Sequence, residues 1–170
     1  AYIGYFHVEH HQGYARIERI LKDLFGLSIS EGTIKTKLDE LKTLLKQEYD
    51  NILENLRRSK VIGSDTTGIR IEGKNGQLFT YQNVFYTYLR SGRSKAFKVI
   101  EETIGNIFDG YWVSDRDPAQ LKVQALHQLC LPHLKRDCKY SMEAYKSEWA
   151  ENLKQILEDA MMFRKKKGEE

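Results

Sequence analysis

The fold is decided by one stretch, Val61-Ile62-Gly63-Ser64-Asp65-Thr66-Thr67-Gly68-Ile69-Arg70-Ile71-Glu72-Gly73-Lys74. Apolar residues lead into Asp65, and Ile69 and Ile71 then alternate with charged residues, which predicts a strand with one buried face. A carboxylate in such a strand is costly to desolvate unless a hydrogen bond, a cation or a metal offsets the cost. Asp65 is therefore either a strand-end residue that caps a turn or part of a functional site.

A second stretch has the same design and favours the functional interpretation. In the segment 109–118 a turn leads into an aromatic and β-branched strand that ends on Ser114-Asp115. Two strands that each deliver an aspartate after a serine can bring both carboxylates to one point of a sheet. Oxygen ligands of this kind suit Mg²⁺ or Mn²⁺. Two such ions in one cleft can cut and rejoin phosphodiesters.

The residues between these stretches predict how the two aspartates meet. We expect a hairpin turn at Gly73–Gly76 because Asn-Gly accepts positive φ, and then two aromatic strands at 78–83 and 84–89. A helix over 95–107, capped by Ser94, should cross over and place the fourth strand parallel to the first and beside it. The predicted fold is α/β (α+β), a mixed sheet with three antiparallel strands, a crossover helix and a parallel fourth strand.

The N-terminal part is predicted to be helical. An amphipathic helix over 14–25 ends at Gly26, and Ser28 or Ser30 caps a second helix. This pattern is typical of a helix-turn-helix, although a plain helical hairpin fits equally well. The pattern persists without Gly or Pro from 33 to 58, which predicts one long connector or dimerising helix. Lys35 and Lys37 of the second helix can face DNA phosphates.

The C-terminal part is also predicted to be helical after Pro118, with a possible short fifth strand near 121–129 and a helix start at Pro132. A long helical stripe runs from Cys138 to Met161. His127, Cys130, His133 and Cys138 have the chemistry to bind zinc, but the spacing lacks the usual pairs. The favoured interpretation places His133 near the cleft, with Lys135 and Arg136 on phosphate.

Composition narrows the class of protein. The net charge of +3 permits an anionic partner without requiring one. Two cysteines give no disulfide framework, and no apolar run is long enough to span a bilayer, so a cytoplasmic protein without membrane contact is expected. The chain begins and ends without start or stop signals, and we expect it to be a fragment of something longer.

Five motifs in order resemble the insertion sequence 66 family of DDE transposases. They are His-His-x-x-Tyr-x-Arg-Ile at 10–17, Leu-Phe-Gly-Leu-Ser-Ile-Ser-Glu-Gly-Thr at 24–33, Ser-Asp-x-Thr-Gly-x-Arg-x-x-Gly-Lys at 64–74, Val-Ser-Asp at 113–115 and Cys-x-x-His-Leu-Lys-Arg at 130–136. Each motif alone is weak, and the five in register are specific. The resemblance covers nearly the whole chain. It implies a ribonuclease-H-like core at 60–170 preceded by the helical region 1–59, a bacterial source and Mg²⁺-dependent cleavage and strand transfer at transposon ends.

The resemblance also implies roles for individual residues. Asp65 and Asp115 match the first and second catalytic aspartates and would hold Mg²⁺ or Mn²⁺. The third acidic residue, a glutamate on a later helix, has no convincing match among Glu143, Glu148, Glu151 and Glu158, so the core would be truncated before it. The family usually has Asp-Glu-Thr-Gly where this chain has Asp65-Thr66-Thr67-Gly68, and Asp117 is an added carboxylate that can assist as a metal ligand. The residues expected to bind DNA are Arg70, Arg93, Lys135, Arg136, His133, Lys35 and Lys37.

Three functions follow as hypotheses. The first is a transposase that acts on DNA as a homo-oligomer, whose isolated fragment is inactive without the third acidic residue. The second is a catalytically incomplete DNA-binding or dimerisation remnant of a transposase that works through residues 14–58. The third is a ribonuclease-H-like nuclease or resolvase, which would need four carboxylates in its cleft.

Overall fold

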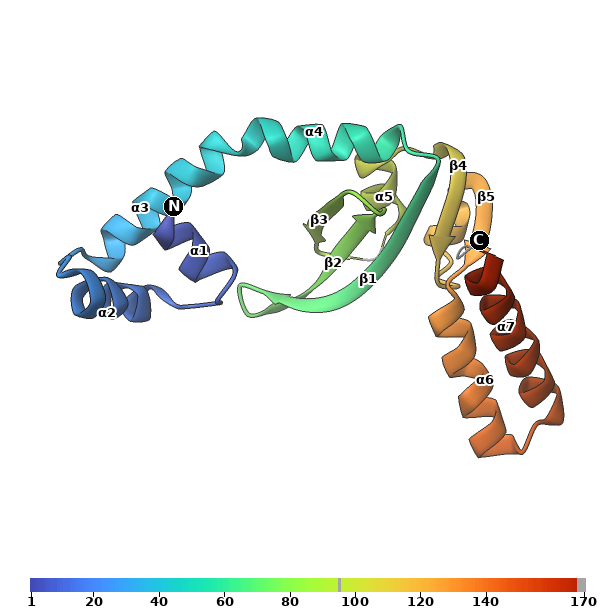
Figure 1. Cartoon of the computed structure of the whole chain (residues 1–170). Coiled ribbons are helices and arrows are strands. Elements are labelled where there is room, and N and C mark those ends of the chain that lie inside the picture. The colour runs from blue at the N-terminus through green and yellow to red at the C-terminus, as the bar shows by residue number, and fades with distance from the viewer. Residues whose placement is uncertain (95, 168–170) are drawn as a thin grey trace. The chain divides into compact units, whose positions relative to one another are not determined.

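The computed structural model describes residues 1–94 and 96–167. The chain divides into two compact units, Ala1–Ile52 and Leu53–Glu170. The proposed functional division into 1–59 and 60–170 stays a prediction. Figure 1 shows the helices of the first unit and the sheet and helices of the second. Among the described residues, no helix has the length and apolar character needed to cross a membrane.

The first unit contains α1 (Tyr2–Val8), α2 (Tyr14–Phe25), α3 (Glu31–Leu44) and the start of α4 (Lys46–Arg57). Gly26 ends α2 in the left-handed conformation at φ 66°, as its position predicted. Ser30 caps α3 by accepting a hydrogen bond from the Thr33 N–H at 3.2 Å. A small core of Ile17, Leu21 and Ile34 holds these helices together.

The prediction of one long helix over 33–58 is wrong, because the helix breaks between α3 and α4. Leu45 has φ −87° and ψ 0°, which lies in the sparsely allowed bridge region between helix and strand. No Gly or Pro marks the position, so the sequence carries no signal for this break.

The second unit is built on a five-stranded sheet in the order β3-β2-β1-β4-β5. Its elements are β1 (Val61–Ile71), β2 (Lys74–Gln82), β3 (Thr87–Gly92), α5 (Phe97–Thr103), β4 (Ile107–Ser114), a short 3₁₀ turn η1 (Gln120–Lys122), β5 (Gln124–Leu129), α6 (Leu131–Tyr145) and α7 (Glu148–Lys167). The first three strands are antiparallel, and β4 lies parallel to β1 and to β5. The predicted fold class, a ribonuclease-H-like mixed sheet with a parallel fourth strand beside the first, is confirmed.

One predicted turn is displaced, and a second turn occupies residues that were predicted to be strand. The β1–β2 turn is Glu72-Gly73, with φ 49° and 74°, whereas Asn75 and Gly76 pair within the strands. Positive φ at both central residues is the two-residue hairpin geometry whose twist matches the strands. In the next hairpin Val84 and Phe85 lie in the turn, and not in a strand as predicted. The Asn83 side chain accepts hydrogen bonds from the Phe85 and Tyr86 N–H groups and so forms the turn.

The helices are also shorter than the sequence predicted. The helix over 95–107 is α5, which ends at Thr103, because Gly105 takes φ 116° and Ile107 already belongs to β4. Lys95 lies outside the described residues. The stripe from Cys138 to Met161 divides between α6 and α7, because Lys146 adopts φ 53° and ends α6. Pro132 lies in the first turn of α6, as predicted, and the fifth strand is present.

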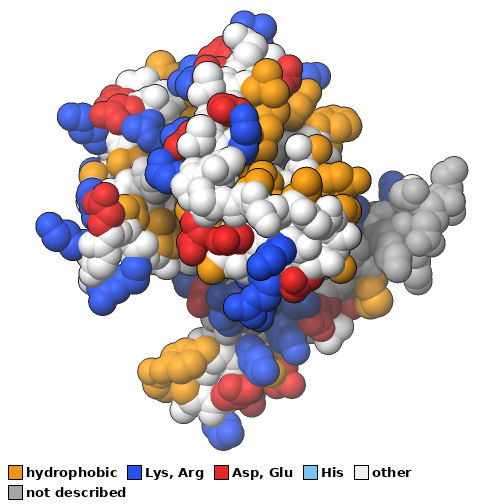
Figure 2. Space-filling view, turned by 90° about the vertical axis from the view of Figure 1, so that its left-hand side faces the viewer, with side chains coloured by type: hydrophobic (Ala, Val, Ile, Leu, Met, Phe, Trp, Pro, Cys, Tyr) orange, Lys and Arg blue, Asp and Glu red, His pale blue; other side chains and the backbone are white. Residues whose placement is uncertain are grey.

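One face of the sheet carries the main core. Ile62 and Trp112 are paired across β1 and β4 and are fully buried, and the Trp112 ring lies 6.2 Å from the Tyr81 ring. Ile100 of α5 is also fully buried. Elsewhere hydrophobic side chains reach the surface between basic and acidic ones, as Figure 2 shows for the face it views. Asp65 lies on the other face of the sheet, and Asp115 directly follows the end of β4.

Candidate functional site

Asp65 and Asp115 occupy matching positions on neighbouring parallel strands. The pairing of β1 with β4 runs to Gly63 and Val113, and each aspartate follows its paired residue by two positions. Ser64 and Ser114 are buried on the core side, so alternation places both aspartates on the opposite face. Asp65 is exposed and Asp115 is half-buried. Because β4 ends at Ser114, Asp115 is the first residue of the loop that follows.

Hydrogen bonds orient both carboxylates. Asp65 Oδ1 accepts from the Thr66 N–H at 2.8 Å, and Asp115 Oδ1 accepts from the Asp117 N–H at 3.0 Å. Asp117 in turn accepts from the Ala119 N–H at 2.8 Å and so begins the η1 turn. The loop after β4 is therefore a chain of carboxylate-to-backbone bonds, which fixes the direction of the Asp115 side chain.

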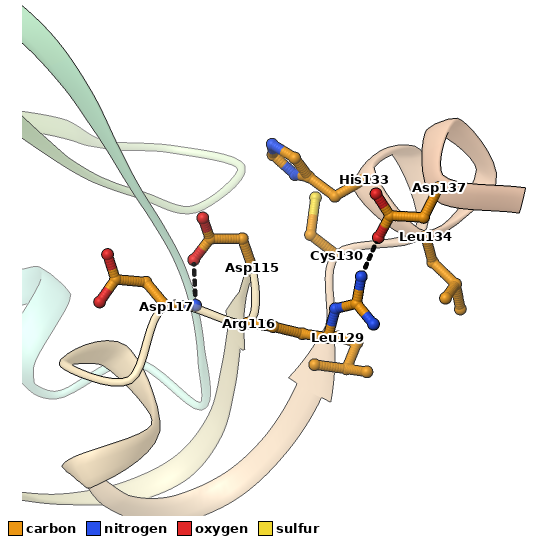
Figure 3. Close-up of a pocket in the computed structure, with 8 residues that line it drawn as sticks. All are labelled: Asp115, Arg116, Asp117, Leu129, Cys130, His133, Leu134 and Asp137. Carbon is orange, nitrogen blue, oxygen red and sulfur yellow. Dashed lines mark hydrogen bonds and ion pairs between the residues drawn. The ribbon is translucent and has the colours of Figure 1, made fainter. Parts of the chain in front are cut away.

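A cavity of about 230 Å³ opens beside Asp115. Figure 3 shows Asp115 and Asp117 on the β4 side and His133 with Asp137 on α6. An ion pair joins Arg116 to Asp137, and both residues line this cavity. His133 Nδ1 is buried and has no hydrogen-bond partner among the described residues. The lining residues are Asp115, Arg116, Asp117, Leu129, Cys130, His133, Leu134 and Asp137; Asp65 is not one of them.

Gln120 is a buried residue of the site that the sequence did not single out. Its Oε1 accepts from the Trp112 indole N–H, and its Nε2 donates to the Thr66 hydroxyl, each at 3.2 Å. The side chain thus joins β4 to β1 directly beneath the aspartate positions. Thr66 stands at the position for which the resemblance implies a glutamate. Its hydroxyl accepts the hydrogen bond from Gln120 and completes this network. No sequence pattern marks a glutamine for burial.

Most of the basic residues expected to hold phosphates have partners within the chain. Their contacts are Lys35 to Asp39 at 2.7 Å, Lys37 to Glu40 at 2.8 Å, Arg70 to Asn75 at 2.6 Å, Arg93 to Glu72 at 2.7 Å and Lys135 to Glu158 at 2.9 Å. The hydrogen bond between Lys35 and Asp39 raises the pKa of Lys35 and lowers the pKa of Asp39. Arg136 is exposed and makes no ion pair with any described residue. Exposed pairs of this kind are weak and can exchange for a phosphate.

The candidates for a third acidic residue lie away from the cavity lining. Glu158 pairs with Lys135, which lowers the pKa of Glu158, and Glu143 pairs with Lys139 at 3.8 Å. Glu148 and Glu151 lie in the exposed first turn of α7. Among residues 1–94 and 96–167, no three His, Cys, Asp or Glu side chains form a group that could hold a metal. The four residues considered for zinc, His127, Cys130, His133 and Cys138, form no such group either. His127 Nε2 instead contacts the Val123 carbonyl at 2.8 Å.

The donor chemistry at Asp65 and Asp115 nevertheless fits magnesium. Protein sites for Mg²⁺ commonly use one or two carboxylates, and water and substrate phosphates complete the octahedron. Within the described part of the chain, the second oxygen of each aspartate makes no hydrogen bond or ion pair. Two carboxylates on one face of neighbouring strands are thus a sufficient protein contribution.

A sheet of this order with aspartates at matching positions of two parallel strands defines a ribonuclease-H-like protein. A family model described as "Transposase IS66 family" matches residues 1–168, and the chain belongs to this family. Comparison with curated proteins gives no significant match. Among solved structures, the chain is similar to "Structure of the HTLV-2 integrase catalytic core domain in complex with magnesium (trimeric form)". That similarity has 11% identity and a TM-score of 0.34, and it covers 56% of this chain and 80% of the other. Similarity this distant says nothing about activity.

Proposed function

We propose that this chain is the catalytic part of a DNA transposase that cleaves phosphodiesters and transfers strands at transposon ends with divalent metal. The observation that carries the proposal is the position of Asp65 and Asp115, two residues beyond a paired position on adjacent parallel strands, in a chain of the IS66 transposase family. Bacterial origin and a homo-oligomeric complex on DNA are further parts of the proposal.

The roles of the site residues follow from their contacts. Asp65 and Asp115 would hold the divalent cation, and the Asp117 N–H donates a hydrogen bond that orients the Asp115 carboxylate. When bound, Mg²⁺ or Mn²⁺ lowers the pKa of an attacking water or 3′ hydroxyl and stabilises the leaving oxygen. Asp117 assists as an outer carboxylate, and His133, which lines the same cavity, contacts the DNA strand.

Binding of the DNA backbone falls to the basic residues. Arg136 is available without exchange of partners, whereas Arg70, Arg93, Lys135, Lys35 and Lys37 must give up an ion pair or a hydrogen bond to bind phosphate. Affinity should fall as salt rises, because phosphate contacts release counterions from DNA.

The test is nicking of supercoiled plasmid in Mg²⁺ and in Mn²⁺. We expect metal-dependent nicking that Asp65→Ala and Asp115→Ala each abolish. Asp109→Ala is the matched control, because Asp109 is an exposed carboxylate of β4 outside the cavity. Nicking that survives both site substitutions would contradict the assignment of the metal ligands.

A second function has one specific observation in its favour. Among the described residues, no three His, Cys, Asp or Glu side chains form a group that could hold a metal ion. A catalytically incomplete DNA-binding or dimerisation remnant of a transposase would show this arrangement. Retention of DNA in a gel-shift assay without nicking in either metal would favour the remnant over the enzyme.

A further inference from the structure

The tip of the β2–β3 hairpin exposes two large hydrophobic side chains. Val84 is 89% exposed and Phe85 is 83% exposed. The turn that carries them is fixed, because the Asn83 carboxamide accepts from two backbone N–H groups and the Asn83 N–H donates to the Tyr86 carbonyl at 2.9 Å. Val84 and Phe85 are the two most exposed large hydrophobic residues of the described chain, which makes this ordered tip a candidate contact surface.

An open cavity of about 900 Å³ lies beside this tip. Its floor includes Gly63 and Val113, the last paired residues before the two aspartates. Two residues span about 7 Å along a strand, so the cavity adjoins the carboxylates on the same face of the sheet. The lining residues are Asn55, Ser59, Lys60, Val61, Gly63, Gln82, Asn83, Val84, Phe85, Tyr86, Val113 and Arg164.

The chemistry of this lining selects an anionic, partly aromatic ligand. None of the described lining residues is acidic. Lys60 and Arg164 make no ion pair with any described residue, in contrast to the paired arginines Arg90, Arg93 and Arg116. Amide side chains at Asn55 and Gln82 add donors and acceptors. Unpaired cations, amides and exposed aromatic rings together are the features that bind a single nucleic-acid strand.

We propose that this cavity binds an unpaired segment of the DNA substrate, with a base stacked on Phe85 and the backbone held by Lys60 and Arg164. The proposal deepens the proposed function, because it names unpaired DNA next to the reacting phosphodiester as part of the substrate. Inside a duplex the base faces are stacked on each other, whereas an unpaired base has a free face that can cover the Phe85 ring. Tyr86, whose ring centre lies 6.3 Å from that of Phe85, forms the other part of the aromatic surface.

The proposal is tested by fluorescence anisotropy with labelled oligodeoxythymidine of about 12 nucleotides, a length that one such site covers. Binding is measured in EDTA, so that the result does not depend on metal or on cleavage. We expect Phe85→Ala to weaken binding by about fivefold to 150-fold, which is the range that stacking of one base supplies. Phe85→Trp should retain affinity and Phe85→Leu should not. In a plot of log affinity against log salt concentration, Lys60→Gln should make the negative slope shallower by about 0.7, because one phosphate contact is lost.

Controls separate this site from general exposure of aromatics. Trp149→Ala is the matched variant, because Trp149 is 71% exposed on α7 and outside the cavity. It should bind the oligonucleotide as the parent does. A 2-aminopurine base in the oligonucleotide should lose fluorescence on binding to the parent and regain it in Phe85→Ala.

Equal affinity of parent and Phe85→Ala for the single strand would overturn the proposal. If Phe85→Ala then also changes the sedimentation of the protein, the tip is assigned to a protein contact. Binding that depends on Phe85 in a chain that does not nick plasmid would contradict the proposed catalysis and leave this site standing.

Discussion

Gln120 joins the two aspartate-bearing strands through a single buried side chain. It is 1% exposed and bonds Trp112 of β4 and Thr66 of β1. A buried glutamine is favourable only when its donors and acceptors are paired, and here each end of the amide has a partner. Gln120 therefore adds a buried side-chain link to the backbone pairing of β1 with β4.

We predict that Gln120→Leu destabilises the protein by about 1–3 kcal/mol, because the Trp112 indole N–H stays buried without an acceptor. Urea unfolding followed by tryptophan fluorescence measures the change. Gln124→Leu on exposed β5 is the control and should shift stability by less than about 0.5 kcal/mol. Equal stability of the two variants would show that the amide network contributes nothing.

Tyr81 makes stability depend on pH at the alkaline end. Burial raises the pKa of Tyr81 to about 12, although Thr103 and Arg90 nearby oppose the shift. The folded state thus binds the phenolic proton more tightly than the unfolded state, whose pKa is about 10. The stabilisation is complete below about pH 10 and is lost as pH rises toward 12.

We predict that Tyr81→Phe removes this alkaline loss, and that the parent loses stability between about pH 10 and 12 more steeply than the variant. Urea midpoints across this range give the comparison. Tyr145→Phe, an exposed tyrosine of α6, serves as the control and should follow the parent. Parallel curves for the parent and Tyr81→Phe would refute the assignment.

At the scale of elements, the contact between β1 and β4 decides the site. A Cβ atom at Gly110 would lie 2.5 Å from the Lys60 carbonyl oxygen, which itself accepts a hydrogen bond from the Tyr111 N–H at 2.9 Å. Gly110 lies at the irregular point of the pairing between β4 and β5. Only a residue without a side chain lets β4 approach the residue that precedes β1.

We predict that Gly110→Ala destabilises the sheet by about 1–3 kcal/mol, because backbone atoms must move to relieve the contact. Gly68→Ala is a matched control within β1, since a Cβ there meets nothing within 4 Å. Thermal unfolding of both variants tests the difference. Similar midpoints for the two alanine variants would show that β4 can move away from Lys60 without a loss of stability.

The helical hairpin of α6 and α7 contributes to the site through one of its two helices. α6 brings His133 and Asp137 to the cavity beside Asp115, as Figure 3 shows. Lys135 does not line the cavity and instead forms an ion pair with Glu158 of α7. In the motif Cys-x-x-His-Leu-Lys-Arg, the cysteine and the histidine therefore line the cavity, and the lysine joins the two helices of the hairpin.

At the scale of the whole molecule, binding of metal at the two aspartates should raise the stability of the sheet. A ligand that binds only the folded state adds about 1.4 kcal/mol at a concentration tenfold above its Kd. We predict that Mg²⁺ raises the Tm by a few degrees, and that Asp65→Asn or Asp115→Asn removes the rise. Differential scanning fluorimetry with and without Mg²⁺ makes the measurement. Asp109→Asn should respond as the parent does, and a full response in both site variants would refute the metal site.

The local sequence determines the features of this protein whose conformation depends on residues close together in the chain. The limits of α2 and β1, the Gly26 cap and the Ser30 cap follow from periodicity and from side chains that bond their own backbone. The preference for simple crossover connections extends this reach, because a helix after the third strand favours a fourth strand that returns parallel to the first. The adjacency of β1 and β4 was therefore predictable.

Only the tertiary structure decided features that depend on contacts between distant segments. Asn75-Gly76 has the sequence of a turn, yet the pairing register places the turn at Glu72-Gly73. The partner of Thr66 lies 54 residues away at Gln120. Burial of a glutamine and the partners of Lys135 and Arg116 are likewise set by packing between segments, because a polar side chain is stabilised by whichever atoms the fold brings to it. By itself the sequence determined which strands carry the aspartates, and the fold decided what surrounds them.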